Sequence, residues 1–200
     1  MKSKLESKMD FLIEVDRLKQ VLRQSLVIHG DEAGEMRREN TAEHSWHLAT
    51  SVLVLAEHSN EKVDILKVVK MALIHDVVEI DAGDTFAYDD HGNGSKNDRE
   101  QKAAERLFTI LPPPLSDELK ALWREFELGR SSEAKFVSAV DRMLPMVANS
   151  RTGGHSWKKH RVRAEQVLQK CQVIERGSVE LADYAANLVE ESVRLGILAE

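Results

Sequence analysis

Hydrophobic residues recur at the three- and four-residue spacing of amphipathic helices along most of this 200-residue chain. Strand-like alternation is nearly absent, and glycine and proline fall between the periodic segments. We expect helices over residues 11–23, 41–57, 65–78, 99–111, 116–128, 132–150, 158–175 and 179–198. The spacing therefore predicts an all-α fold.

One pair of adjacent residues stands out at the end of a predicted helix. His75-Asp76 follows a strongly apolar run, with Glu79 and Asp84 shortly after it. On a helix, Glu79 neighbours both residues, being four positions after His75 and three after Asp76. Burying such groups is costly unless a cation or hydrogen bonds compensate them. The sequence therefore predicts a metal site here, with an acidic side chain near the metal-bound water.

A second predicted helix offers a further imidazole ligand. Asn40 is suited to the N-cap position, and Glu43 three residues later completes a capping box, so we interpret Glu43 as structural. His44 then lies in the first turn and His47 one turn later on the same face. Spacing alone leaves either histidine as the ligand.

A third predicted helix, residues 132–150, carries Asp141. Pro145 stands four residues later and lacks an amide hydrogen, so the carbonyl of Asp141 loses its helical partner. We expect a bend that turns Asp141 toward the core, although such bends also occur where nothing binds.

Together these motifs resemble a known family. The runs RRENTAEHSWHLA, ALIHDVVEIDAGD and AKFVSAVDRMLP, within about residues 18–141, resemble the HD-domain metal phosphohydrolases and their 5'-deoxynucleotidase-like branch. The resemblance implies His44, His75, Asp76 and Asp141 as ligands of one divalent metal and leaves His47 outside the shell. It also implies catalytic roles for Glu79 and Asp84.

The resemblance further implies a phosphate-binding arginine at the end of the first helix, where Arg23 stands. A guanidinium suits phosphate because its planar fork donates two parallel hydrogen bonds. An exposed cation that favours the helix C-terminus is the alternative interpretation. Gln24 replaces the aromatic residue that the family places near the sugar, and extra residues precede Arg37. The resemblance therefore leaves the sugar preference open.

The predicted chemistry follows from the ligand types. Two imidazoles and two carboxylates suit Mn, Fe, Co, Ni or Zn better than Ca. Such a cation supplies hydroxide near neutral pH. Glu79 would orient or deprotonate the water, and Asp84 would protonate or steer the leaving group or position the nucleophile. We expect a phosphomonoesterase acting on (deoxy)nucleoside 5'-monophosphates. The alternatives are hydrolysis of a cyclic or pyrophosphorylated nucleotide by the same centre, and a non-catalytic nucleotide-binding HD protein.

The segment after the motif, residues 81–98, is polar and contains glycine, so we expect a long binding loop. Phe86 or Tyr88 in it are candidates to stack on a base, whereas His91 is interpreted as a solvated loop residue. The basic run 158–163 is interpreted as a solvated helix face.

Composition sets the remaining expectations. We expect one domain over residues 1–200, with a metal-site core at about 18–150 and C-terminal helices over 156–198 packing on it. The net charge of -6, with Lys and Arg scattered, argues against binding a nucleic acid polymer. Cys171 lies on an apolar stripe and is expected to be a buried thiol. No apolar run has membrane-spanning length, so we expect a cytoplasmic protein, and the resemblance implies a homodimer.

Overall fold

The computed structural model describes residues 2–28, 36–88 and 90–200. Helices dominate it, and a small antiparallel sheet pairs Leu22 with Asn40 and Leu26 with Arg38. The elements are α1 (Lys4–Asp16), η1 (Arg17–Gln20), β1 (Leu22–Leu26), β2 (Arg38–Asn40), α2 (Thr41–Val54), η2 (Ala56–His58), α3 (Ile65–Ile74), α4 (Glu79–Ala82), α5 (Asp90–Phe108), α6 (Leu115–Leu128), α7 (Ser132–Arg151), α8 (His155–Lys159), α9 (Ala164–Gly177) and α10 (Val179–Arg194). The all-α prediction is confirmed.

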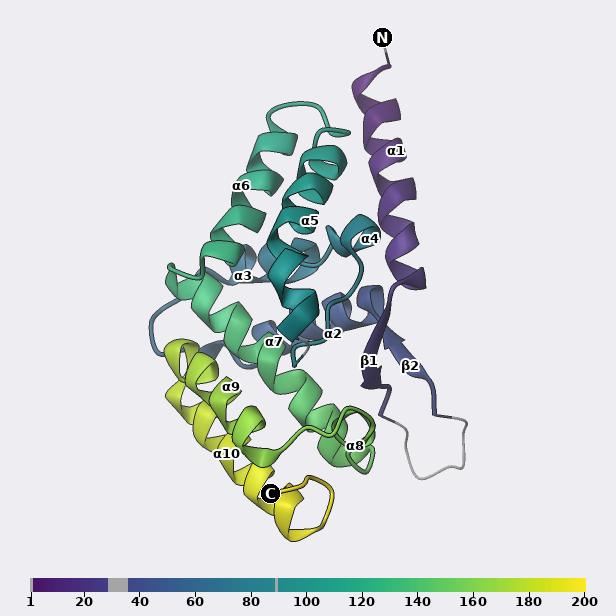
Figure 1. Ribbon diagram of the computed structural model, residues 1–200. Helices are drawn as coiled ribbons and strands as arrows, with labels where there is room; N and C mark the ends of the chain where they lie inside the picture. Colours follow the sequence, from purple (N-terminus) through teal and green to yellow (C-terminus); the bar gives the residue numbers. More distant parts are fainter. Residues whose placement is uncertain (1, 29–35, 89) are drawn as a thin grey trace.

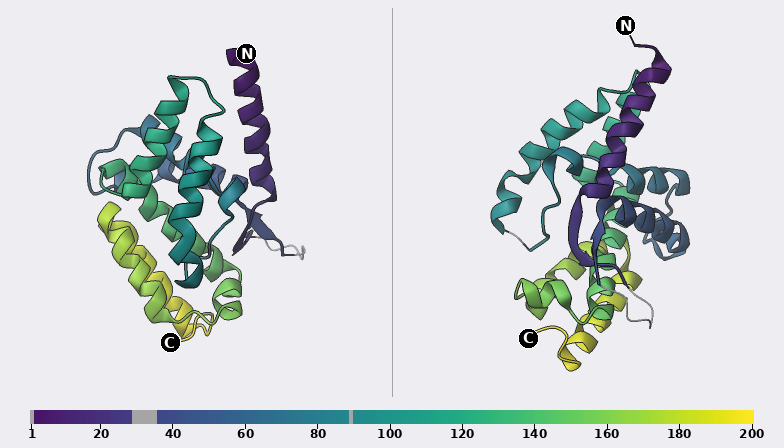
Figure 2. Two further views of the ribbon diagram at one scale, coloured as in Figure 1. Left: turned by 45° about the horizontal axis from the view of Figure 1, so that its top comes forward. Right: turned by 90° about the vertical axis from the view of Figure 1, so that its right-hand side faces the viewer.

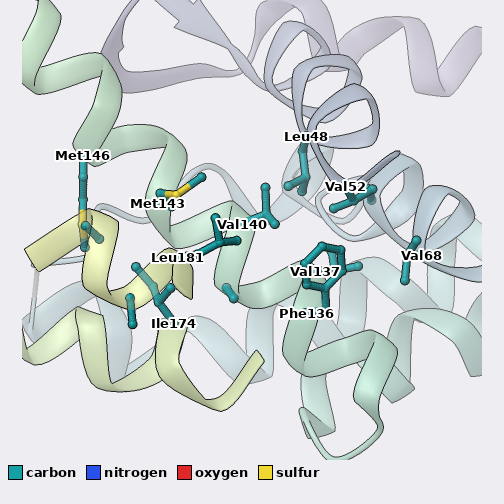
Figure 3. Close-up of a cluster of buried hydrophobic side chains, with 14 of the residues drawn as sticks. Leu48, Val52, Val68, Phe136, Val137, Val140, Met143, Met146, Ile174 and Leu181 are labelled. Atoms are coloured by element: carbon teal, nitrogen blue, oxygen red, sulfur yellow. The ribbon is translucent and has the colours of Figure 1, made fainter. Parts of the chain in front are cut away.

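Helix α7 is the central element of the fold (Figure 1), and it contacts α2, α3, α6, α9 and α10. Its buried residues include Phe136, Val137 and Val140, which meet side chains from α2, α3, α9 and α10 in one hydrophobic cluster (Figure 3). Because α7 also carries Asp141, the same helix that organises the core places one of the predicted site residues. A rigid core therefore supports that residue.

A second hydrophobic cluster joins α1, α5 and α6, and Phe108 and Trp123 are fully buried in it. The side chain of Ile74, at the end of α3, packs against both clusters. Helix α1 lies beside α5 at one end of the molecule, whereas α9 and α10 lie side by side at the other (Figures 1 and 2). No described helix is long and apolar enough to cross a bilayer.

The prediction of a helix over residues 11–23 is wrong beyond Asp16. A short η1 turn follows α1, Val21 is extended, and β1 then pairs with β2. The side chain of Arg38 donates hydrogen bonds to the carbonyls of Leu22 and Arg23. These long-range contacts override local helical preference, which is worth only tenths of a kcal/mol per residue (about 0.7 at most for ordinary residues).

Three other predicted boundaries also differ. Helix α3 ends at Ile74, and tight turns separate it from α4. The predicted loop 81–98 is shorter, since α4 reaches Ala82 and α5 begins at Asp90, and the predicted helix 158–175 is divided into α8 and α9. The division falls at residues 160–163, where Arg161 has a positive φ of 53°. The predicted role of His91 lies outside the described side chains.

Cys171 is half-buried, not buried, and its thiol donates to the carbonyl of Val167 at 3.9 Å. The basic run 158–163 is exposed except for Val162, as expected for a solvated face.

Candidate functional site

The predicted metal ligands arrive from separate elements. His44 lies in the first turn of α2, after an Asn40 cap whose capping box with Glu43 is formed as predicted. His75 is the C-cap of α3, and Asp141 lies midway along α7. Both imidazoles are buried, at 1% and 2% exposed. Caps and core packing therefore fix the side chains that converge here.

His44, His75 and Asp141 form a compact group, in which one ligand atom from each residue lies within 4.8 Å of the others. Nε2 of His44 is 2.9 Å from Oδ1 of Asp141, and Nε2 of His75 is 3.9 Å from the same oxygen. Separations of this size allow all three atoms to face one cation with small side-chain adjustments.

The ring of His75 is oriented for ligation. Its Nδ1 lies 2.9 Å from the carbonyl oxygen of Ala72, which can only accept, so Nδ1 donates a hydrogen. Its Nε2 is buried without a hydrogen-bond partner in the described structure. Metal-binding histidines commonly donate one ring nitrogen to a carbonyl and ligate with the other. The donor set thus fits a divalent cation.

Asp76 lies against this group. Its Oδ2 is 3.0 Å from Nε2 of His75 and 3.9 Å from Nε2 of His44, and it accepts a hydrogen bond from Arg23 at 2.9 Å. Burial raises the pKa of Asp76, but the charges of His75 and Arg23 outweigh burial and lower it. Asp76 therefore stays ionised beside the imidazoles.

His47 lies away from the group. It is half-buried, and its ring stacks on Trp46 with centroids 6.4 Å apart. Of the two histidines that spacing left open, the structure brings His44 to His75 and Asp141.

Glu79 and Asp84 both line a hollow that also reaches Asp76 and Asp141. Glu79 is 5% exposed, and its Oε2 accepts a hydrogen bond from the hydroxyl of Thr41 at 2.9 Å. Burial and the charge of Asp76 raise the pKa of Glu79 well above its usual range, and burial also raises that of Asp84. Glu79 begins α4 and does not continue α3, so the tight turns, not uniform helical spacing, bring it to the site.

Arg23 lies on β1, not at a helix end. Its buried guanidinium bonds Asp76 and lies 3.7 Å from both Asp84 and Glu39. Its Nε is buried without a hydrogen-bond partner in the described structure. Burial disfavours the charge of Arg23, but the surrounding carboxylates more than offset burial and raise its pKa. The interpretation of Arg23 as an exposed helix-end cation is wrong.

Two residues of the site escaped the sequence analysis. Glu39 places Oε2 3.7 Å from Nδ1 of His44, and burial raises the pKa of Glu39 to about 7. Glu39 lies in the RREN run, which is part of the family resemblance, but the sequence analysis assigned it no role. Lys96 was hidden in the segment expected to be a loop, and helix α5 brings it to the site.

A hollow of about 190 Å³ opens beside His44, His75 and Asp141, the candidate metal-ligand group, and we call it the front hollow. It is lined by the charged residues Arg23, Asp76, Glu79 and Asp84 and by the aromatic side chains of Phe86, Tyr88 and Trp157. The rings of Phe86 and Tyr88 meet edge-on with their centroids 5.3 Å apart, and the ring centroid of His160 lies 4.3 Å from that of Phe86. Charged groups and aromatic rings therefore share one cavity, as a phosphate joined to a ring would require.

A second hollow of about 290 Å³, which we call the rear hollow, is lined by residues of α5, the end of α6, α7 and α9. Asp76, Lys96, Asp141 and Arg142 line both hollows. Both hollows therefore reach the candidate metal-ligand group, the front hollow through Asp141 and the rear hollow through His75 and Asp141.

A sequence profile of the HD domain matches residues 15–182. The chain belongs to the HD-domain family. The match spans the whole candidate metal-ligand group, all of α9 and the first residues of α10.

This HD-domain chain is similar to the 5'-deoxynucleotidase HDDC2 of Bos taurus, with 34% identity over 67% of the chain and 62% of that protein. It is 32% identical to HDDC2 of Homo sapiens, over 68% of the chain and 63% of that protein. The matched part of the chain thus spans less than two thirds of the length of these relatives.

Among solved structures, a predicted metal-dependent phosphohydrolase from Magnetospirillum magnetotacticum superposes with a TM-score of 0.91 and 47% identity, covering 99% of this chain and 97% of that one. The PH0347 protein from Pyrococcus horikoshii superposes with a TM-score of 0.60 at 21% identity, over 94% and 99% of the two chains, which indicates a shared fold alone.

Proposed function

We propose that this HD-domain protein is a metal-dependent phosphohydrolase that removes phosphate from nucleoside 5'-monophosphates. The observation that carries the proposal is the group of His44, His75 and Asp141, in which Nε2 of His75 is buried without a hydrogen bond in the described structure. A second observation is Arg23, which lines the front hollow and whose Nε is likewise buried without a hydrogen bond in the described structure. The first fits a cation and the second an anion. The names of the relatives, 5'-deoxynucleotidase and metal-dependent phosphohydrolase, support the same activity.

His44, His75, Asp76 and Asp141 would hold the metal, which we expect to be one of Mn, Fe, Co, Ni or Zn. When bound, such a cation lowers the pKa of a water molecule and polarises a phosphoryl oxygen. The tautomer that Ala72 imposes on His75 keeps Nε2 available for this ligation.

The raised pKa of Glu79 makes it a stronger proton acceptor than an ordinary carboxylate. The hydrogen bond from Thr41 fixes one of its oxygens, so Glu79 would take the proton of the attacking water with the other. Asp84, whose pKa is also raised, would give a proton to the leaving oxygen. The two carboxylates thus divide the proton transfers of one hydrolysis.

Arg23 would bind the phosphate. One of its nitrogens is bonded to Asp76, and the unpartnered Nε leaves a donor for a phosphate oxygen. Phe86 and Tyr88, which line the same hollow, would contact the nucleoside. The presence of aromatic as well as charged side chains in one hollow favours a nucleotide over a bare phosphate.

The test is phosphate release from ribo- and deoxyribonucleoside 5'-monophosphates, cyclic nucleotides and nucleoside triphosphates, with metal-stripped protein reloaded separately with Mn, Co, Zn and Mg. We expect turnover of monophosphates only. Turnover confined to cyclic nucleotides or triphosphates would replace the proposal with the phosphodiesterase or pyrophosphohydrolase alternative. Absence of turnover in metal-loaded protein would refute an enzymatic role and favour nucleotide binding.

Two variants separate ligation from proton transfer. Glu79→Ala should keep bound metal and lose turnover, whereas Asp76→Ala should lose both. Metal analysis of the purified variants checks this, and equal metal loss in the two would contradict the assigned roles.

We also propose a cytoplasmic homodimer. On α10, Leu181 and Ala185 pack inside the chain, whereas Tyr184 on the same helix is exposed. Light scattering of the purified protein would decide the oligomeric state.

A further inference from the structure

Lys96 stands at the junction of the two hollows. It is half-buried on α5 and lines the front hollow with Arg23, Asp76 and Glu79. It also lines the rear hollow, where its Nζ lies 3.5 Å from Oε1 of Glu100. Its ammonium is therefore held beside the metal-ligand group by a helix that contributes none of the proposed ligands.

The charges around Lys96 keep it protonated. Burial lowers the pKa of Lys96, but Glu100 and Asp76 outweigh burial and raise it above its usual value. Glu127 and Glu79 add to the same effect. Lys96 is therefore a cation of the front hollow, which Arg23, Arg142 and Lys170 also line.

A phosphate dianion that enters the front hollow meets Asp76, Glu79 and Asp84, all acidic. Arg23 offsets only part of this charge, because one of its nitrogens is bonded to Asp76 and Asp84 lies close to it. A second cation that reaches the phosphate would reduce the repulsion further. A flexible lysine suits the role because its ammonium carries three rotatable donors.

Arg142 is the other cation that lines both hollows. Asp76 and Glu79 are among the acidic groups whose charges raise the pKa of Lys96. Because Lys96 lines both hollows and lies among these acidic groups, we take it as the candidate for a phosphate beside the metal ligands.

We propose that Lys96 is a substrate-binding residue that contacts the phosphate from α5, as Arg23 would from β1. This inference rests on the proposed function, because it assumes that the phosphate of the substrate lies in the front hollow. It adds α5 to the elements that build the active site.

The test compares Lys96→Met, Lys96→Arg and, as a matched control, Lys102→Met, which changes an exposed lysine of the same helix. The first measurement is the dissociation constant of inorganic phosphate for metal-loaded protein, determined by calorimetry. Loss of one charge-assisted hydrogen bond should weaken phosphate binding roughly 10- to 100-fold in Lys96→Met. Lys96→Arg should recover part of the loss, and Lys102→Met should bind phosphate like the wild type.

Metal content and the thermal unfolding midpoint are measured on the same samples. Unchanged phosphate affinity in Lys96→Met would overturn the proposal. So would loss of metal in both Lys96 variants, since that would make Lys96 a support of the metal site. If the wild type hydrolyses no nucleotide, the proposed function fails, while the phosphate titration still decides whether Lys96 binds phosphate.

Discussion

Asn149 joins α7 to α8 through a buried set of hydrogen bonds, and its replacement should destabilise the protein. Its Oδ1 accepts from the backbone nitrogens of Ser156 and Trp157, at 3.0 and 3.3 Å, and from the hydroxyl of Ser156 at 2.9 Å. Its Nδ2 donates to the carbonyl of Pro145 at 2.9 Å. In Asn149→Ala two buried amides lose their acceptor, and each unsatisfied group costs about 1–3 kcal/mol.

We expect Asn149→Ala to lower the free energy of unfolding by about 3 kcal/mol, which lies within the range for two such groups. For a chain of this size the unfolding midpoint should fall by about 6–12 °C. Urea and thermal unfolding followed by circular dichroism measure both quantities. The matched control is Asn187→Ala, an exposed asparagine on α10, which should change stability by less than about 0.5 kcal/mol. A loss in Asn149→Ala no larger than in the control would refute this account.

Three further changes test other parts of the structure. Thr41→Val removes the hydroxyl that holds the proposed general base, so turnover should fall at least about tenfold with metal content unchanged, as kinetics and metal analysis will show. In Gly177→Ala the new Cβ would lie 2.3 Å from the carbonyl oxygen of Lys135, so α9 would have to move away from α7. The free energy of unfolding, measured in urea, should therefore fall by about 1–3 kcal/mol. The hydrogen bond to Glu180 raises the pKa of His58, so its stabilising effect should be present at acidic pH and fade as pH rises through that pKa. In an NMR titration, Glu180→Gln should lower the pKa of His58, and an unchanged value would contradict the pairing.

Local signals were sufficient to predict much of the fold. The capping box at Asn40 correctly predicted the start of α2. Gly129, in a left-handed conformation, ends α6 at the boundary predicted after residue 128. Both depend on residues within one turn of the boundary. Long-range effects escaped prediction, since the pairing of β1 with β2 is set by Arg38, far along the chain from the strand that it stabilises.

The site residues were likewise predicted where local signals suffice and missed where long-range contacts decide. The sequence led to His75 and Asp141, because each lies on a strongly periodic helix at the expected spacing. It could not show how Arg23 enters the site, because that requires a strand where the periodicity indicated a helix. Lys96 was missed because a polar segment with glycine is typical of a loop, and neighbouring helices stabilise α5 there.

The carboxylates proposed as metal ligands differ from those proposed to transfer protons. Burial raises the pKa of Asp141, but the hydrogen bond and charge of His44 outweigh burial and lower it, as the charges of His75 and Arg23 do for Asp76. Among the described residues no imidazole pairs with Glu79, and burial raises its pKa, as it raises that of Asp84. Carboxylates that remain ionised suit a cation, whereas those with a raised pKa suit proton transfer. The directions of the pKa shifts therefore distinguish Asp76 and Asp141, the proposed ligands, from Glu79 and Asp84, which would exchange protons.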